Sequence, residues 1–557
     1  MARTRDVSNV LVQPFAVTLG TSNYRAGVNA GNSIQSGGNY NTVVGDESGT
    51  AITTGDNNTL IGYVAGDAIS TSSANTAVGS FAMTSMTDGS DNVAVGTSAL
   101  DIDTKGSQSV AVGRNALGSQ NFTSAVNAIS TAVGYNAGGA VTTGVNNVLI
   151  GGFAGDALTG TADYSGGSNN VAVGRAALGA DTLGSATVAI GFEALLAQNF
   201  TSTTESYNTA VGYRAGLSVT SGAANTLIGG LAGDALTVGN SNVAIGTSTL
   251  TTDTKGDRAV AIGPGALENQ NFTTSTDNYN VAIGRDAGND ISTGVENTLI
   301  GGLAGDALTD ADDNTVIGYQ ALTACTVGSR NVAIGSGSLF VANPSTAANT
   351  DNTAVGFNSG VAITTGVTNT CIGNRSGGVV TTGSDNTFLG VATNASATGA
   401  SNQIVIGAGI AATGDNTFNF GKASNVVTNT FTSNASFSRS SDVHKKTNIE
   451  DDTLGLDFIN DLRTVTFNWR PNSEFPEHYK DYHPTKNDME TDIKLHGMVA
   501  QEVKAALDKA GVDTFGGWSE EEDGSQRISQ EMFIHPLIKA VQELSDEVKQ
   551  LKEKING

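Results

Sequence analysis

The sequence predicts a mainly β fold: a trimeric β-solenoid or β-roll shaft of 17-residue coils, followed by a small α+β domain that ends in a trimeric coiled coil. Three observations predict this. One five-residue motif recurs through most of the chain, glycine is abundant while aromatic residues are few, and the repetition stops abruptly near residue 440.

The repeated motif is Asn-[Thr/Val]-[Ala/Leu]-[Val/Ile]-Gly, as in NTLIG at 58–62 and NVAIG at 331–335. Its closing glycines run from Gly45 to Gly421 at one regular spacing, which a four-residue insertion lengthens at intervals. Short apolar runs between Gly- and Asn-rich turns predict one strand after another at a fixed period. Because one such unit cannot bury its own apolar face, the units must stack on each other as a solenoid.

Each recurring position of the motif has a physical role in such a stack. The closing glycine permits a positive φ or a close backbone approach, and the asparagines can form a ladder from coil to coil. At about 4.8 Å per coil the shaft is on the order of 100 Å long. Such a short coil has room for only small core side chains, so we expect three shafts to pack around an axis. The repeats resemble the head repeats of YadA-type trimeric autotransporter adhesins, which form trimeric β-rolls.

Composition excludes several classes of function. The formal net charge of −25 argues against nucleic-acid binding, which needs a basic surface. Cys325 and Cys371 are too few for a disulfide framework and are interpreted as small apolar side chains. We predict no cofactor and no metal. The N-terminus lacks the apolar region of a secretory signal, and no apolar run reaches the roughly 20 residues of a membrane helix, so no membrane insertion is expected.

The chain changes character after Ser441, where all five histidines and both tryptophans lie. A helix is predicted within 449–470, followed by a strand that ends at Trp469, and a second helix over 496–511. Near the end, apolar residues alternate at spacings of three and four, which predicts a heptad seam and favours a parallel trimer over a helix packed on its own domain. The seam consists of Ile534, Leu537, Val541, Leu544, Val548, Leu551 and Ile555.

Four segments of this second part carry a resemblance: SDVHKKTNI (441–449), LGLDFINDLRTVTFNW (454–469), HGMVAQEV (496–503) and IKAVQEL (538–544). They resemble the C-terminal intramolecular chaperone of phage tailspikes and tail fibres, the self-cleaving peptidase S74 domain of endosialidases. The resemblance implies that Ser441 is the nucleophile, that Lys446 is its basic partner, and that the bond between Ser441 and Asp442 is cut. From the residues alone, Ser441 would be a helix N-cap and Lys446 a solvated charge.

The resulting domain prediction has four parts. Residues 1–40 attach to the virion, 41–421 form the shaft, 422–440 are a connector, and 441–557 are the chaperone with a coiled coil over about 534–555. The predicted function is that of a homotrimeric phage tail fibre or spike that mediates host attachment. Its expected partners are tail, baseplate or adaptor proteins and a host cell-surface receptor such as a glycan. It would be made in the host cytoplasm and reside in the virion, with autoproteolysis as its one expected enzymatic activity.

Such a shaft needs help in folding, because nearly identical coils specify their alignment poorly. A C-terminal domain that associates first would align the copies at one end and could then be cut away.

Two other classes of function remain open. A depolymerase spike that acts on host glycans needs paired carboxylates in a cleft and aromatic platforms. The recurring Gly-Asp turns of the shaft supply Asp67, Asp156, Asp234 and Asp306, which are interpreted as turn-formers. A cell-surface adhesin or ice-binding solenoid would use the Thr-rich turns, but these lack unbroken Thr-x-Thr ladders.

Overall fold

The structure is a computed structural model that describes residues 20–423, 425–431, 438–439, 441–487 and 489–556. The chain divides into two compact units, Met1–Arg439 and Ser440–Gly557, and each is described by itself. Parts of the predicted attachment segment (residues 1–19) and of the predicted connector (424, 432–437 and 440) lie outside the described residues.

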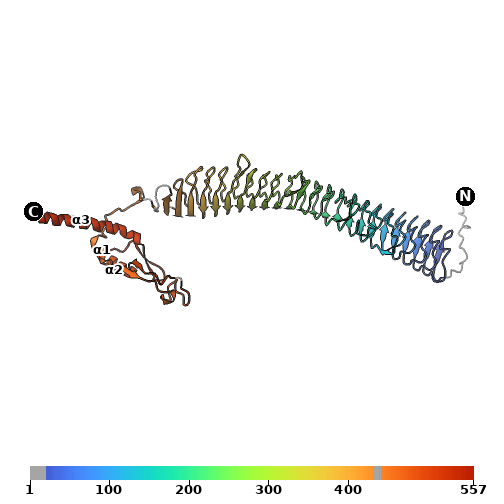
Figure 1. Ribbon diagram of the computed structural model, residues 1–557, viewed down its shortest axis with the longest axis horizontal. Coiled ribbons are helices and arrows are strands. Elements are labelled where there is room, and N and C mark those ends of the chain that lie inside the picture. Colours follow the sequence, from blue (N-terminus) through green and yellow to red (C-terminus); the bar gives the residue numbers. More distant parts are fainter. Residues whose placement is uncertain (1–19, 424, 432–437, 440, 488, 557) are drawn as a thin grey trace, which may run out of the picture. The chain divides into compact units, whose positions relative to one another are not determined.

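The first unit is a β-solenoid, as predicted. A single 25-stranded sheet runs along it, with one short strand from each coil stacked on the next (Figure 1). Pairing is parallel and in register from β1 to β31, as in Thr59↔Thr76 and Ile61↔Val78. Its strands are β1 (Tyr24–Ala26), β2 (Thr42–Val44), β3 (Thr59–Ile61), β4 (Thr76–Val78), β5 (Val93–Val95), β7 (Val110–Val112), β9 (Thr131–Val133), β10 (Val148–Ile150), β11 (Val171–Val173), β13 (Val188–Ile190), β15 (Thr209–Val211), β16 (Thr226–Ile228), β17 (Val243–Ile245), β19 (Val260–Ile262), β21 (Val281–Ile283), β22 (Thr298–Ile300), β23 (Thr315–Ile317), β25 (Val332–Ile334), β27 (Thr353–Val355), β28 (Thr370–Ile372), β29 (Thr387–Leu389), β30 (Ile404–Ala408), β31 (Thr417–Lys422), β32 (Asn425–Thr430) and β33 (Ser438–Arg439).

The solenoid sheet extends beyond the predicted shaft of 41–421 at both ends. β1 already pairs with β2, and the sheet ends in an antiparallel pairing of β31 with β32 and of β32 with β33. The four-residue insertions form separate two-stranded parallel sheets, which are β6–β8 (Gly106–Ser107, Val126–Asn127), β12–β14 (Gly184–Ser185, Thr204–Glu205), β18–β20 (Gly256–Asp257, Thr276–Asp277) and β24–β26 (Gly328–Ser329, Ala348–Asn349).

The closing glycines and the asparagines have the roles that the sequence predicts. Gly62 has a φ of 143°, and a Cβ atom there would lie 2.4 Å from the carbonyl oxygen of Gly79 in the next coil. The Asn75 amide nitrogen donates to the carbonyl oxygen of Gly89 (2.9 Å), while its side-chain oxygen accepts from the backbone N–H of Asn92 (3.1 Å). The buried asparagines thus satisfy backbone groups that the turns leave unpaired.

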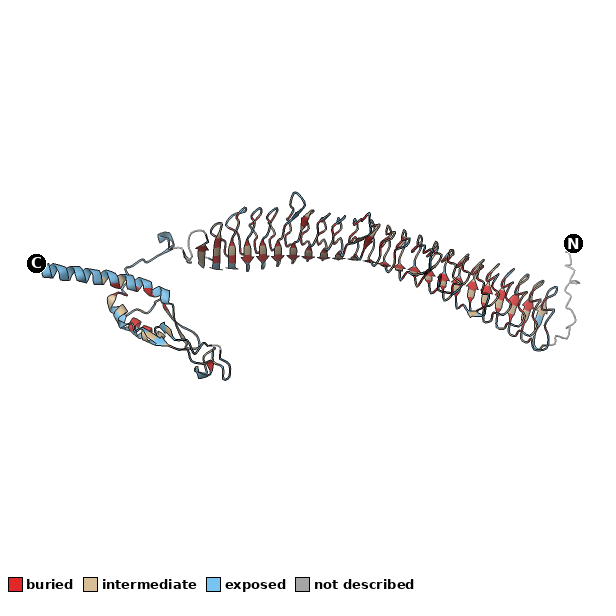
Figure 2. Cartoon of the chain, in the orientation of Figure 1, coloured by how far each residue is buried: buried red, intermediate tan, exposed pale blue. Residues whose placement is uncertain are grey.

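The core of the solenoid is narrow and mostly apolar. In the three-residue strands from β2 to β29 the middle residue is buried, as are the small residues of the following turn, and buried segments recur along the sheet (Figure 2). A second buried column contains Ile52, Ile69 and Met86 and then, in the next coil, Asp103. The core is therefore not uniform from coil to coil.

The second unit is a small α+β domain. Its elements are η2 (Val443–Lys445), α1 (Leu456–Asp461), β34 (Val465–Phe467), η3 (Asn472–Glu474), β35 (Leu495–Gly497), α2 (Ala500–Ala510), β36 (Trp518–Glu520), β37 (Gln526–Ile528), η4 (Gln530–Phe533) and α3 (Ile534–Asn556). Two antiparallel hairpins, β34–β35 and β36–β37, accompany the helices. The helix predicted over 496–511 begins later, at Ala500, because residues 495–497 pair with β34 instead.

Phe458 of α1, Phe515 and Phe533 form the centre of this unit, with ring centroids 5.2 to 6.4 Å apart. Leu454, Val503 and Leu507 complete the core. No helix in the described part of the chain is long and apolar enough to cross a membrane.

Candidate functional site

Ser441 and Lys446 lie at the start of the second unit and contact each other. The Lys446 side-chain nitrogen donates a hydrogen bond to the Ser441 hydroxyl oxygen at 2.7 Å. The short 3-10 helix η2 lies between them in sequence, and Lys446 follows it with φ −121° and ψ 147°. This turn brings two side chains five residues apart in sequence within hydrogen-bonding distance, which is the geometry of a nucleophile beside a base.

Asp442 organises the turn between the two residues. Its side-chain oxygen Oδ1 accepts from the backbone N–H of His444 and lies 2.8 Å from His444 Nδ1. The backbone hydrogen bond from His444, then the contact with its ring and the nearby charge of Lys445, lower the pKa of the Asp442 carboxyl. Asp442 thus caps η2, the role that the residue-based alternative gave to Ser441, and the sequence analysis missed the contribution of His444.

Every residue from Ser441 to Glu450 is exposed in the single chain. A lysine can accept the serine proton only as a neutral amine, and removal from water favours that neutral form. The single chain therefore already forms the contact between Ser441 and Lys446. It does not bury Lys446, and burial is what would favour the neutral amine.

The predicted heptad seam lies on one continuous helix, α3, and is uncovered. Its seven side chains are between 41% and 80% exposed. The helix packs on its own unit through a different face, which buries Pro536 and Ala540 and directs Glu543 toward α1. There the Glu543 carboxylate accepts from the backbone N–H of Leu456 at 2.6 Å, so it caps α1, a contact that the sequence analysis also missed.

A set of buried polar pairs, which we call the Asp–Gln pairs, occurs inside the solenoid. These are Asp103–Gln120, Asp181–Gln198 and Asp253–Gln270, and the Gln side-chain nitrogen donates to the Asp carboxylate at 2.7 Å in each. Each carboxylate also accepts from two or more backbone N–H groups, such as those of Gly256 and Phe272 at Asp253. The pairs fasten the first three of the four-residue insertions to the coil before each. They are a structural device rather than a catalytic site.

The Gly-Asp turn residues are separated from one another along the solenoid. Asp234 and Asp306 lie four coils apart, which is about 19 Å at about 4.8 Å per coil, whereas the two carboxyl groups of a glycosidase lie about 5 to 9.5 Å apart. Partial burial raises the pKa of all four carboxyls, those of Asp67, Asp156, Asp234 and Asp306. The four Gly-Asp carboxyls therefore do not form a general acid–base pair with one another.

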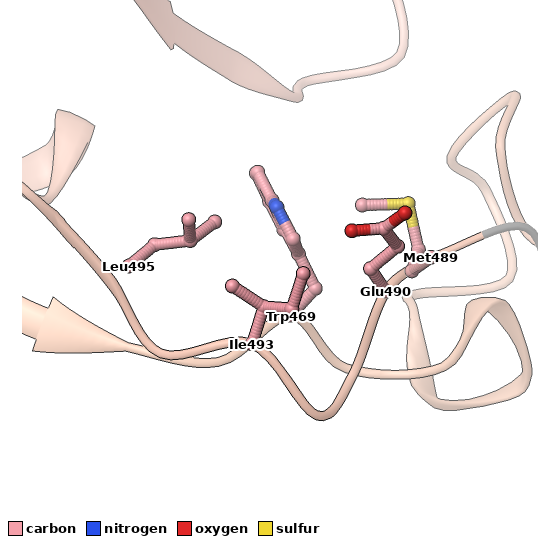
Figure 3. A pocket seen from close by; sticks show the side chains of 5 residues that line it. All are labelled: Trp469, Met489, Glu490, Ile493 and Leu495. Carbon is pink, nitrogen blue, oxygen red and sulfur yellow. The ribbon is translucent and has the colours of Figure 1, made fainter.

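A hollow of about 310 Å³ lies on the second unit, beside Trp469, which follows β34, and Leu495, the first residue of β35 (Figure 3). Met489 and Ile493 add apolar side chains, and Glu490 supplies its one carboxylate. With a single acid it lacks the pair that glycoside hydrolysis needs. Among the residues that the structure describes, no three His, Cys, Asp or Glu side chains are grouped to hold a metal ion.

Comparison with known proteins places one family on this part of the chain. Residues 441–512 match the Peptidase S74 family, described as chaperone of endosialidase. No curated protein and no solved structure matches the chain. The matched segment begins at Ser441, contains both members of the Ser–Lys contact, and ends just after α2. The chain thus carries a chaperone-of-endosialidase domain in its C-terminal part, preceded by a long β-solenoid.

Proposed function

We propose that the chain is a homotrimeric tail-fibre or tailspike protein of a phage, assembled by a C-terminal intramolecular chaperone that cuts itself away. The solenoid is the shaft that mediates host attachment, and the second unit aligns the three copies. The observation that carries this proposal is the 2.7 Å contact between Lys446 and Ser441, at the first residue of the matched domain and two residues beyond the end of the solenoid unit.

The proposed cleavage follows from that contact. The neutral Lys446 amine takes the Ser441 proton, the oxygen attacks the carbonyl carbon of the bond to Asp442, and the amine of Asp442 leaves with a proton. Water then hydrolyses the resulting ester and restores the hydroxyl. A hydroxyl that attacked the carbonyl of its own residue would close a strained four-membered ring. The attacking Ser441 therefore belongs to a neighbouring copy, which makes cleavage depend on assembly.

The uncovered seam of α3 supports association of the copies. Seven apolar side chains at alternating spacings of three and four form the pattern of a coiled coil, and the unit's own core does not cover them. The glycan depolymerase alternative gains no support from the separated Gly-Asp carboxylates.

The test compares wild type with Ser441→Ala by denaturing gel electrophoresis after expression of the full chain. We expect a fragment of residues 442–557 from the wild type and an intact chain from the variant, with both samples associated before denaturation. An intact wild-type chain in a properly associated particle would remove the protease from the proposal.

A further inference from the structure

One face of the solenoid sheet is uncovered along its whole length. In each three-residue strand of the long sheet from β2 to β29 the middle side chain is buried, whereas the first and third point outward. We call the first and third side chains together the outer sheet face. The third side chain is always valine, isoleucine or leucine, and many are 36% to 44% exposed, such as Ile61, Ile150, Ile228 and Leu389.

The outer sheet face carries no charge. Its first positions are threonine or valine and its third positions are branched aliphatics, in a chain whose formal net charge is −25. Parallel sheets in proteins are almost always covered on both faces. Within each coil the turn covers the inner face alone, so the outer sheet face is an apolar surface that needs a partner.

The border of this face has the composition of a protein interface. The position directly after the closing glycine is exposed in many coils, and in six of them it holds an aromatic residue: Tyr63, Tyr135, Phe192, Tyr213, Tyr319 and Phe357. Arg175 and Arg214 lie over the rings of Phe192 and Tyr213, which stack on each other at 5.6 Å. Tyrosine, phenylalanine and arginine are enriched at protein–protein interfaces, while lysine and glutamate are depleted.

The regular spacing of the face identifies its occupant. Its side chains repeat once per coil, in register, from β2 to β29. A surface that repeats at one fixed step over this length is matched throughout only by a partner with the same step, and a second copy of this chain has it. Because the face is uncharged, copies of this acidic chain meet there without like-charge repulsion.

We propose that the outer sheet face is the surface through which copies of the chain associate, side by side and coil against coil. This inference rests on the homotrimer of the proposed function and adds to it the face that is buried. It also leaves the Asp- and Thr-rich turns as the surface that a host receptor meets.

Cysteine cross-linking of the full chain tests the assignment. Ile228→Cys places a thiol on the outer sheet face, and Ser221→Cys places one in the exposed turn just before the same strand, β16. The native Cys325 and Cys371 are buried and do not compete for reagent. Each variant is treated with a short bifunctional maleimide and run on a denaturing gel, and its mass in solution is measured by light scattering.

We expect both variants to have the mass of the associated wild type and Ile228→Cys alone to give covalently linked chains in high yield. Linkage at Ser221→Cys, at both positions equally, or at neither, in particles of the associated mass, would overturn the face assignment while leaving the homotrimer intact. A monomeric mass for the wild type would overturn the homotrimer and the face assignment together.

Discussion

Lys446 contributes its side-chain nitrogen to the proposed cleavage, whereas its neighbour Lys445 contributes a backbone N–H that donates to the Asp442 carbonyl oxygen at 3.0 Å. We predict that Lys446→Arg slows self-cleavage by about 100- to 10,000-fold, because a guanidinium does not release its proton to become a base. The fraction of cut chain against time on a denaturing gel measures this. Lys445→Ala is the matched control, since it keeps the backbone contact, and it should cleave at the wild-type rate. Equal rates for wild type and Lys446→Arg would contradict the role of Lys446.

The Asp–Gln pairs come with a natural comparison in the chain itself. At the equivalent positions of the next insertion, Cys325 and Ala342 stand in place of Asp253 and Gln270, so both polar groups are replaced together. We predict that Asp253→Cys or Gln270→Ala alone destabilises the solenoid by about 1 to 3 kcal/mol, because each leaves a buried polar partner unpaired. The double variant should be more stable than the sum of the two losses predicts, by about 0.5 to 3 kcal/mol. Thermal unfolding of the wild type, the two single variants and the double variant measures these losses. If the loss of the double variant equals the sum of the two single losses, the pairing is contradicted.

Burial makes the same pair sensitive to pH. Desolvation raises the pKa of the Asp253 carboxyl, and the hydrogen bonds from Gln270 and from the backbone oppose this only in part. The folded state then holds the proton more tightly than the unfolded state, so the stabilisation is full below the ordinary carboxyl pKa, about 3.9, and is lost as the pH rises through the folded pKa. We predict that the melting temperature of the Asp253→Cys, Gln270→Ala double variant falls less between pH 4 and pH 7 than that of the wild type. Parallel profiles would contradict this assignment.

At the level of single elements, Gly229 and Gly230, which directly follow β16, allow the effect of a close backbone approach to be measured. An alanine at either position removes the flexibility of a glycine, but only an alanine at Gly229 would clash with the next coil. Gly229 has a φ of 139°, and a Cβ atom there would lie 2.2 Å from the carbonyl oxygen of Gly246, while a Cβ atom at Gly230 meets nothing within 4 Å. We predict that Gly229→Ala destabilises the solenoid by more than about 2 kcal/mol. Gly230→Ala should stay within about 0.5 kcal/mol, since tyrosine or phenylalanine stands at that position in other coils. Thermal unfolding of the two variants measures both losses of stability. Equal losses for Gly229→Ala and Gly230→Ala would contradict the close approach of the coils at Gly229.

Helix α3 offers a similar matched pair for association. Leu544 lies in the seam, and the exposed Gln542 lies outside it. We predict that Leu544→Asn weakens association of the full chain, because a buried seam tolerates a polar side chain at a cost in stability. Gln542→Asn should associate as the wild type does, which sedimentation or light scattering over a range of protein concentrations can measure. If Leu544→Asn associates with unchanged affinity, the seam is not an interface.

The regular elements were predictable from the sequence, while their exceptions were not recognised. The fixed period of the motif places one strand and one closing glycine in each coil and a buried asparagine in most coils, and that pattern predicted the solenoid. The Asp–Gln pairs were overlooked because their members lie in neighbouring coils, so neither stands out locally. Aligning the coils would have placed Asp103 in the same column as Ile69 and Met86, which is a readable signal. The helix predicted over 496–511 was too long because hairpin pairing, a tertiary contact, determines the conformation of His496.

The candidate site was only partly visible in the sequence. The resemblance indicated Ser441 and Lys446, but the 2.7 Å contact depends on the turn η2, which Asp442 caps. The Glu543 cap on α1 joins residues 87 positions apart, and no local pattern could predict it.

At the scale of the whole molecule, the Asp–Gln pairs specify how the coils of one chain align with one another. A slip of one coil within a chain would bury a carboxylate without its glutamine, which costs stability, so the fold resists that error by itself. A slip between copies carries a smaller penalty, because the outer sheet face repeats at every coil. Alignment between copies is therefore the task that we propose for the C-terminal unit.

The most direct measurement compares assembly of residues 1–440, produced without the second unit, with assembly of the full chain. Mass in solution and electron microscopy of both samples over time would show how many copies associate and whether their ends are level. The account predicts that residues 1–440 alone stay unassociated or form particles of staggered length, while the full chain gives uniform rods. Uniform rods of the same mass, formed at the same rate from residues 1–440, would contradict it.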